Sequence, residues 1–325
     1  MKRTHSRLTG LRLVDLRTLA KLDIAKSKIL VTGATGFIGQ CLVRRLVEAG
    51  AQVWTTGLPG EQSPSGVVGH LPLDVRDGDA VRAIVAEAAP QVVFHLAAVG
   101  VTDPGVDAAL TLEVNVGGTV HLLDALKGRQ IERIVLVGTC YEYGAREAVE
   151  GLDPFNAYAA SKVAAWAFGR MYWRAYGLPV VTGRPFQVYG PGQPSHTLVP
   201  AAIRAALAGD DFPMTPGGQE RDFIYLDDVV DGLLSAAQAP GIEGCSLDLG
   251  TGRVHTVRHI VERIWEMTEA RGRILAGDLP YRPGAVMHLV ADADHTTRLT
   301  GWRARVGLEE GLRHTIEMIA SFTDG

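Results

Sequence analysis

The chain has 325 residues, of which 46% are hydrophobic and 21% are charged, so it can bury one large core or two smaller ones. Its formal net charge of −4 gives no basic footprint, which argues against nucleic acid as a partner. The three cysteines, Cys41, Cys140 and Cys245, are dispersed without metal-ligand spacing, and this usage is typical of a reducing compartment.

The start of the chain is basic but lacks the apolar core of a secretory signal. No apolar run reaches the roughly 18 to 20 residues that cross a bilayer. We therefore expect a cytoplasmic protein with no membrane partner. Residues 1–27 carry leucines at about helical spacing among basic residues. They are predicted to be an N-terminal extension on the surface, with an oligomer contact or a regulatory arm as the alternative.

From residue 28 onward, short apolar runs alternate with segments of helical periodicity. The predicted elements in chain order are a strand at 28–31, a helix at 40–49 closed by Gly50, a strand at 52–55, a helix at 80–89 that ends before Pro90, a strand at 91–96, a helix at 112–126, a strand at 133–138, a helix at 155–176 and a strand at 179–182. Buried strands separated by helices predict an α/β protein with a doubly wound parallel sheet, the Rossmann fold. Ligands of such sheets bind beyond the carboxyl ends of the strands.

The composition changes after Gly183, where Gly and Pro become frequent. We expect residues 28–183 to form the dinucleotide-binding domain, with a segment near 222–248 returning to it. Residues 184–221 and 249–325 are expected to form a smaller, mixed lobe that binds the substrate. The crevice between the two parts is the predicted substrate site.

A glycine-rich run, Thr32-Gly33-Ala34-Thr35-Gly36-Phe37-Ile38-Gly39, links the first strand to the first helix. Gly33 permits a tight turn, Gly36 lets a pyrophosphate approach the backbone, and Gly39 lets the helix pack closely on the sheet. The helix N-terminus offers N–H groups and a partial positive charge to phosphates. The run therefore predicts a dinucleotide site built from Gly33, Thr35, Gly36, Phe37, Ile38 and Gly39.

The end of the second strand separates NAD from NADP in such folds. An acidic residue there holds the ribose hydroxyls, whereas an arginine accepts the 2′-phosphate. Residues 53–58 read Val-Trp-Thr-Thr-Gly-Leu and contain neither. The interpretation is NAD, with NADP as the alternative.

Tyr158 and Lys162 lie four residues apart, and hence on one face of the predicted helix. A tyrosine has an ordinary pKa near 10, so work as a base at neutral pH requires about 4 kcal/mol of extra phenolate stabilisation. The Lys162 ammonium, with the positive nicotinamide ring of an oxidised cofactor, would supply it. Thr139 follows a strand, so its hydroxyl is placed at the same edge and could bond the same substrate oxygen. The pattern predicts proton transfer to and from a substrate oxygen.

Five further motifs accompany these features: Leu73-Asp74-Val75, His95-Leu96-Ala97-Ala98, Asn115-Val116-Gly117-Gly118-Thr119, Arg-Pro-Phe-Gln-Val-Tyr-Gly-Pro-Gly at 184–192, and Arg-Asp-Phe-Ile-Tyr-Leu-Asp-Asp-Val at 221–229. Together they make the chain resemble an extended short-chain dehydrogenase/reductase of the nucleotide-sugar epimerase/dehydratase family, from residue 28 to the end. The resemblance implies a nucleoside-diphosphate sugar as substrate and a homodimer through the helix of Tyr158. It implies the catalytic trio Thr139, Tyr158 and Lys162, and cofactor contacts from Asp74, Val75, Leu96, Ala97, Ala98, Asn115, Tyr158, Lys162 and Pro185.

Similar 4,6-dehydratases carry acidic residues just after the catalytic threonine. Here those positions hold Cys140 and Tyr141, which disfavours dehydration because elimination needs a positioned acid and base. Glu142 lies one step further on and is a candidate substrate-binding residue, with pairing to a neighbouring cation as the alternative.

The resemblance points to three more substrate-binding residues. Gln187 stands where the family usually has asparagine, so the substrate pose is expected to differ. Arg221, in the motif at 221–229, and Arg282 are candidate clamps for the diphosphate, because a guanidinium makes paired bonds to phosphate. For Arg282 the alternative is a solvated arginine in a loop.

Two other patterns are interpreted without chemistry. Asp227 and Asp228 precede an apolar helical run and are predicted to cap it. His255 and His259 have the spacing of a metal pair but no third ligand, so a surface helix is favoured and no metal is expected.

These features predict an enzyme that transfers hydride between NAD(P) and a nucleotide sugar at C4, as a 4-epimerase or a 4-ketoreductase. In it Tyr158 is the acid/base, Lys162 lowers the Tyr158 pKa and binds the cofactor ribose, and Thr139 steadies the reacting oxygen. The alternatives are a nucleotide-sugar 4,6-dehydratase and a non-catalytic protein that senses the cofactor.

Overall fold

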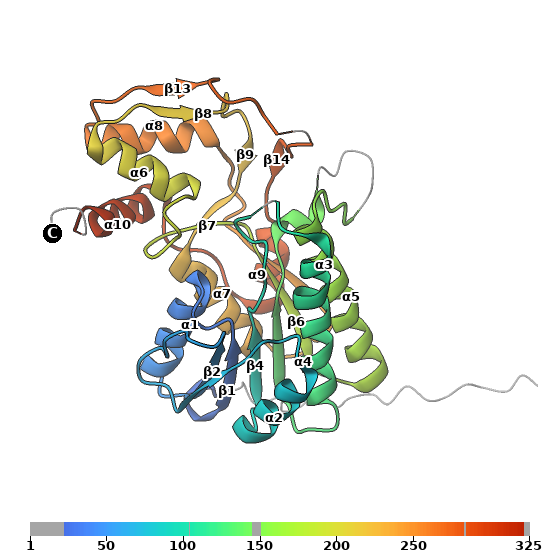
Figure 1. Ribbon diagram of the computed structural model, residues 1–325. Helices are drawn as coiled ribbons and strands as arrows, with labels where there is room; N and C mark the ends of the chain where they lie inside the picture. The colour runs from blue at the N-terminus through green and yellow to red at the C-terminus, as the bar shows by residue number, and fades with distance from the viewer. Residues whose placement is uncertain (1–22, 104, 145–150, 283, 322–325) are drawn as a thin grey trace, which may run out of the picture.

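The computed structural model describes residues 23–103, 105–144, 151–282 and 284–321 (Figure 1). Most of the predicted N-terminal extension lies outside the described residues. The first described element is the short 3-10 helix η1 (Ile24–Lys26), whose Ile24 is buried in the main core.

Seven parallel strands form the main sheet, in the order β11-β6-β5-β4-β1-β2-β3. The strands are β1 (Lys28–Thr32), β2 (Gln52–Gly57), β3 (Gly69–Pro72), β4 (Val92–His95), β5 (Arg133–Val137), β6 (Val180–Pro185) and β11 (Ser246–Leu249). The central strands are apolar and buried along nearly their whole length, as expected of a parallel sheet that is covered on both faces.

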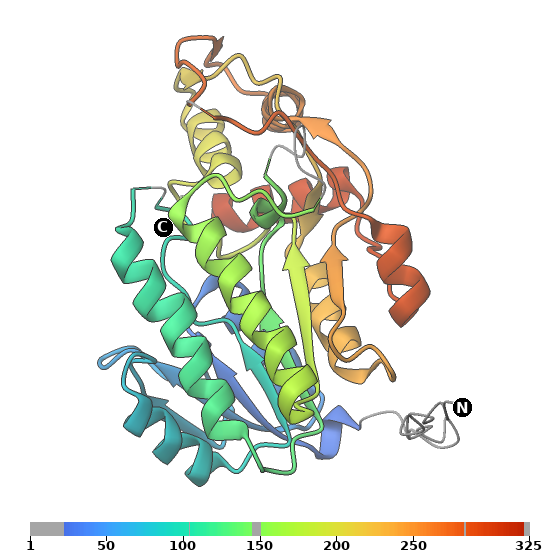
Figure 2. The ribbon, with the colours of Figure 1, turned by 90° about the vertical axis from the view of Figure 1, so that its right-hand side faces the viewer.

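Helices cover both faces of this sheet (Figures 1 and 2). On one face, α1 (Phe37–Glu48) and α7 (Leu226–Gln238) share a core with the sheet. On the other, α2 (Gly78–Ala88), α4 (Gly118–Leu126) and α5 (Ala157–Tyr176) share a second core. The predicted doubly wound Rossmann fold is confirmed.

Side chains and glycines set the helix ends close to where the sequence places them. Asn156 caps α5, because its Oδ1 accepts the Ala159 N–H at 2.8 Å, and Gly177 ends the helix with φ +71°. The helix predicted at 112–126 begins earlier, at α3 (Ala108–Thr111), and passes through a π-helical segment, η2 (Leu112–Gly117), before α4.

A smaller lobe stands beyond the carboxyl edge of the main sheet (Figure 2). Its core lies among α6 (Leu198–Ala208), α8 (Val257–Thr268) and α10 (Leu308–Ser321). Three small sheets complete it: β10 (Phe223–Tyr225) with β7 (Gln187–Tyr189); β13 (Ile274–Ala276) with β8 (Phe212–Met214); and β12 (His255–Thr256), β9 (Glu220–Arg221) and β14 (His288–Leu289). Although they follow this lobe's first segments, α7 and β11 pack in the main sheet layer, and α9 (Ala293–Thr300) packs beside β11.

Three expectations need correction. Strand β3 is absent from the predicted elements, because it is short and only partly buried and so lacks a clear apolar run. Asp227 and Asp228 do not cap α7, because they lie inside its first turn; Asp228 instead accepts the backbone N–H groups of Arg305 and Val306. His255 lies in β12 rather than on the helix that carries His259.

Candidate functional site

The glycine loop between β1 and α1 is shaped for a phosphate group. Gly33 has φ +69°, and a Cβ there would lie 2.6 Å from the Ala97 backbone nitrogen, so only glycine fits. A Cβ on Gly36, by contrast, would meet only the Gly33 oxygen, at 3.4 Å. Gly36 is also the N-cap of α1, and no side chain of the described residues caps this helix. Open space beside an uncapped helix N-terminus fits the pyrophosphate of NAD.

The other residues predicted in the loop lie at its rim. Thr35 is in the turn, while Phe37 and Ile38 form the first turn of α1 and are partly buried against the main core. A Cβ on Gly39 would collide with the Gly33 carbonyl, which explains why the helix can start so close to the strand.

The floor beneath the loop is built from the ends of β1 and β4. His95 is buried between the hydroxyls of Thr32 and Thr119, with its ring nitrogens 2.7 and 3.0 Å from them. Burial, reinforced by the charge of Lys162, lowers the pKa of His95 to about 3, so the ring is neutral. Residues 96–98, predicted to line the cofactor path, follow directly and are partly buried.

Asn115, predicted to be a cofactor contact, holds the backbone after β4 in place. It is 2% exposed, and its amide exchanges hydrogen bonds with both backbone groups of Val99 and donates to the Ser161 hydroxyl at 2.8 Å. Ser161 in turn donates to the carbonyl of Tyr158 at 2.7 Å. Asn115 therefore fastens the loop after β4 to the helix that carries Tyr158.

The three other predicted cofactor residues lie at the ends of strands. Asp74 and Val75 follow β3; Val75 is buried against Gly118, and Asp74 pairs with Arg76 at 2.6 Å. The hydrogen bond from Arg76 lowers the pKa of Asp74. Pro185 is the buried last residue of β6.

Thr139, Tyr158 and Lys162, here called the reaction centre, lie together just past the carboxyl end of β5. Thr139 follows β5, whereas the other two lie in the first turns of α5. The three residues are only 6 to 7% exposed. The Lys162 ammonium lies 5.8 Å from the centre of the Tyr158 ring and donates to the Val137 carbonyl at 2.8 Å. The geometry places one phenol, one hydroxyl and one ammonium at the same edge of the sheet.

Burial dominates the pKa values of Tyr158 and Lys162 in the protein itself. That Lys162 and the positive ring of a bound cofactor together lower the Tyr158 pKa stays a prediction. Burial raises the pKa of Tyr158, and the nearby Cys140 and Glu142 add to the rise, while the Thr139 side chain opposes it. Burial lowers the pKa of Lys162 to about 8, against the raising influence of Glu142. Burial therefore favours the neutral phenol form of Tyr158 in the protein itself.

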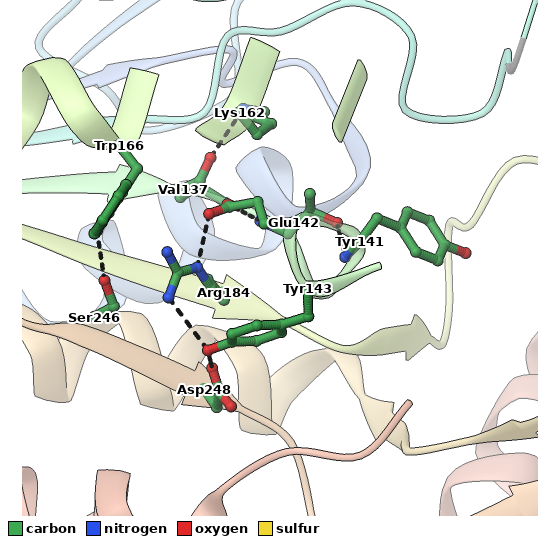
Figure 3. A network of polar contacts seen from close by, with 10 residues as sticks. Val137, Tyr141, Glu142, Tyr143, Lys162, Trp166, Arg184, Ser246 and Asp248 are labelled. Atoms are coloured by element: carbon green, nitrogen blue, oxygen red, sulfur yellow. Dashed lines mark hydrogen bonds and ion pairs between the residues drawn. The ribbon is translucent and has the colours of Figure 1, made fainter. Parts of the chain in front are cut away.

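Glu142 forms an ion pair with Arg184 (Figure 3) and also holds Thr139 in place from inside the protein. It lies in the 3-10 helix η3 (Cys140–Tyr143) and is 0% exposed. One carboxylate oxygen accepts the Thr139 N–H at 2.9 Å, and the other accepts Arg184 Nε at 2.8 Å. Arg184 also donates to the Tyr143 hydroxyl, which donates to Asp248 at 2.6 Å.

Glu142 is therefore not a substrate contact, contrary to the prediction. Its carboxylate is turned away from solvent and both oxygens are used. The alternative, pairing with a neighbouring cation, is confirmed by the buried ion pair with Arg184. The sequence carried no signal for this pair, because its two members are 42 residues apart.

Tyr141, Gln187, Arg221 and Arg282, here called the substrate side, converge on the opposite side of η3. The Tyr141 hydroxyl donates to Gln187 Oε1 at 3.2 Å. Burial raises the pKa of Tyr141 to about 12, and the charges of Arg221 and Arg282 act against this rise, which places both guanidinium groups near the ring. Arg282 is exposed, whereas Arg221 is partly buried.

The Arg221 guanidinium is held by two hydrogen bonds and keeps further N–H donors for a ligand. Its guanidinium donates to the carbonyls of Glu220 at 2.8 Å and Val286 at 2.5 Å. A guanidinium has five N–H donors, so three are left over from these two bonds. The neighbouring Asp222 is 0% exposed and binds the backbone of Thr251 and Gly252, so it has a structural role. From the sequence, Tyr141 is notable only because it stands where similar dehydratases carry an acidic residue. Its contact with Gln187 was not predicted.

The described His, Cys, Asp and Glu residues do not form a metal site. Within the described ranges, no group of three or more His, Cys, Asp or Glu side chains is placed to hold a metal ion. The rings of His255 and His259 stack with centroids 5.3 Å apart, and burial together with His259 lowers the pKa of His255. Among the described residues, no helix is both long and apolar enough to cross a bilayer.

Comparison with known proteins places this geometry among nucleotide-sugar enzymes. Residues 29–246 match the model of the NAD dependent epimerase/dehydratase family. The chain is 32% identical to a UDP-glucose 4-epimerase of Mycolicibacterium smegmatis, over 89% of this chain and 97% of that protein. It is 29% identical to a probable dTDP-glucose 4,6-dehydratase of Sinorhizobium fredii, over 89% and 92% respectively.

Solved structures agree. The fold matches the UDP-glucose 4-epimerase of Thermus thermophilus in complex with NAD with a TM-score of 0.80 and 30% sequence identity. The match covers 90% of this chain and 98% of that one.

Proposed function

The chain belongs to the NAD dependent epimerase/dehydratase family, and on that premise we propose that it is a nucleoside-diphosphate-sugar 4-epimerase. The observation that carries the proposal is the complete, buried set of Thr139, Tyr158 and Lys162, in a site where the three residues after Thr139 offer no free acid or base. The similarity to UDP-glucose 4-epimerases in sequence and in structure supports it.

In this proposal Tyr158 exchanges a proton with the oxygen on C4 of the sugar. The phenol form that burial favours is the proton donor, and the same group accepts the proton in the reverse direction. NAD, when bound, supplies the acceptor and donor of the C4 hydride. Thr139 is the second hydrogen-bonding group for the reacting oxygen, and Lys162 keeps positive charge beside the phenol.

Epimerisation requires that the 4-keto sugar rotate in the site, so that its opposite face meets the cofactor, while the diphosphate stays bound to the protein. We assign the holding to Arg221 and Arg282, because guanidinium groups make paired, charge-assisted bonds to phosphate. Tyr141 is hydrogen-bonded to Gln187 and is under the electrostatic influence of both arginines, so we assign these two residues to contacts with the sugar or the nearer phosphate.

The chain is also similar to a probable 4,6-dehydratase, but it lacks the acidic and basic side chains that dehydration needs. Loss of water needs a group that removes the C5 proton and one that protonates the leaving hydroxyl. The pKa values of Cys140 and Tyr141 are each raised to about 12, chiefly by burial, so neither is a base at neutral pH. Glu142 is bound to Arg184 and Thr139. The three residues that follow Thr139 therefore argue against a 4,6-dehydratase.

The test is to incubate the purified protein with UDP-glucose and follow the anomeric proton by NMR. A 4-epimerase converts the substrate to an equilibrium mixture with its C4 epimer without net consumption of cofactor. Stoichiometric oxidation of added NADH by a nucleoside-diphosphate 4-keto sugar would instead identify a 4-ketoreductase. Formation of a 4-keto-6-deoxy product would identify a dehydratase, and the absence of turnover with intact NAD binding would favour a cofactor sensor.

We also propose a homodimer through α5. The exposed side chains Phe168, Met171 and Tyr176 lie on this helix and give it apolar surface for a partner copy. Light scattering after size-exclusion chromatography tests it; a monomer at micromolar concentration would contradict it. The cytoplasmic location and the division into domains at residues 28, 184, 222 and 249 stay predictions.

A further inference from the structure

The loop after β2 folds an acidic side chain back onto the end of that strand. Glu61 and Leu58 close a four-residue turn: the Glu61 N–H donates to the Leu58 carbonyl at 3.0 Å, and the Leu58 N–H donates to Glu61 Oε2 at 2.8 Å. The same oxygen accepts the hydroxyl of Thr35 at 2.7 Å. The carboxylate is thus tied to the glycine loop, although the two residues are 26 positions apart.

Gly57, the last residue of β2, makes room for this carboxylate. A Cβ on Gly57 would lie 2.5 Å from Glu61 Oε2, and 3.1 Å from both Thr35 Cγ2 and His70 Cε1. The backbone of Gly57 does not itself require glycine, because its φ is not positive. The Glu61 carboxylate therefore occupies the volume that a side chain at the end of β2 would fill.

That volume has a defined use in a Rossmann fold. The ribose of the adenosine lies between the glycine loop and the end of the second strand, where an acidic side chain bonds its hydroxyls. Here the strand end carries no acid of its own, while Glu61 Oε2 lies against both structures that frame the ribose. Among the described residues, Glu61 Oε1 accepts no hydrogen bond and can take a hydroxyl.

We propose that Glu61 holds the adenosine ribose and makes the enzyme selective for NAD over NADP. This inference rests on the NAD-dependent function proposed above and names a residue that determines its cofactor specificity. The carboxylate accepts hydrogen bonds from the ribose hydroxyls but repels a 2′-phosphate. No lysine or arginine occurs between residues 52 and 72 to offset that repulsion.

The experiment is calorimetric titration of the nucleotide-free protein with NAD and with NADP. Wild type is expected to bind NAD more tightly than NADP. Glu61→Gln is expected to weaken NAD about ten- to hundredfold and to leave NADP unchanged or tighter. The matched control is Glu87→Gln, which removes the same charge from an exposed position on α2 and should change neither dissociation constant.

A second pair of variants tests the position of the acid. Glu61→Ala should lose affinity for NAD, and Gly57→Asp/Glu61→Ala, which moves the carboxylate onto the strand end, should recover at least tenfold of it. If Glu61→Gln binds NAD and NADP with the dissociation constants of the wild type, the inference is overturned and the proposed function stays intact. The same holds if the double variant recovers no affinity for NAD. A wild-type protein that binds neither nucleotide would overturn both.

Discussion

Neighbouring residues of η3 serve two regions that are built differently. Glu142 points into the protein and fixes the reaction centre through the buried ion pair with Arg184 (Figure 3). Tyr141 points the other way and contacts Gln187 near Arg221 on the substrate side, where side chains are partly or fully exposed. The difference teaches that the residues around Thr139 are held by buried internal bonds that leave little freedom. On the other side, the Arg221 guanidinium keeps donors for the ligand that we propose.

Removal of the proton donor should have the largest effect. Tyr158→Phe keeps the ring and its packing but removes the group that exchanges a proton, so turnover should fall about 10²- to 10⁴-fold while NAD binding is kept. The measurement is the rate of epimer formation alongside a calorimetric titration with NAD. Tyr176→Phe, exposed on the same helix, is the control and should retain full activity. Substantial turnover by Tyr158→Phe would break the assignment of the reaction centre.

The next effect separates the buried pair from surface pairs. Glu142→Ala leaves the Arg184 charge buried without its partner and should lower the free energy of unfolding by about 3 to 5 kcal/mol. Asp211→Ala breaks the exposed pair with Arg273 and should cost far less, because water and salt screen the two charges. Urea unfolding measures both. Equal losses would mean that the two regions do not differ in the way described.

The buried ammonium of Lys162 should appear in the pH dependence of stability. Its pKa is about 8 in the folded protein and 10.5 in the unfolded reference. Between these values only the unfolded chain binds the proton, so this group makes stability rise with pH in that window. The unfolding free energy of wild type relative to Lys162→Met should increase by up to about 3 kcal/mol from pH 8 to 10.5. If the difference in unfolding free energy between the two proteins stays constant or falls over this pH range, the lowered pKa of the buried Lys162 is contradicted.

The smallest expected effect is on the substrate side. Arg221→Lys keeps the charge but loses the paired geometry, so KM for the nucleotide sugar should rise about tenfold with kcat nearly unchanged. Arg258→Lys, whose guanidinium makes an exposed pair with Glu262, is the control and should leave KM unchanged. A loss confined to kcat would move Arg221 from recognition to chemistry.

The fold, and the meeting of Thr139, Tyr158 and Lys162 at one edge of the sheet, could be predicted from the sequence because their signals are local. Period, glycine spacing and the four-residue interval of Tyr158 and Lys162 each depend on neighbouring residues. Even so, Asp228 was misread as a cap, because its partners are the distant N–H groups of Arg305 and Val306.

What could not be read from the sequence depends on long-range pairing and on desolvation. Nothing near Glu142 indicates that Arg184 meets it from another strand. Burial raises the pKa of Tyr158, and burial is a property of the whole fold that no local motif reveals. The Glu61 carboxylate reaches the end of β2 only because its loop turns back, so a search of the strand itself finds no acid.

The most direct test of the central claim uses UDP-glucose deuterated at C4. If Tyr158 moves only a proton on oxygen while the C4 hydride is passed to and from NAD within one active site, the epimer formed should keep its deuterium at C4. Loss of the deuterium to solvent water would contradict the account, because it would require a base that removes the C4 hydrogen as a proton.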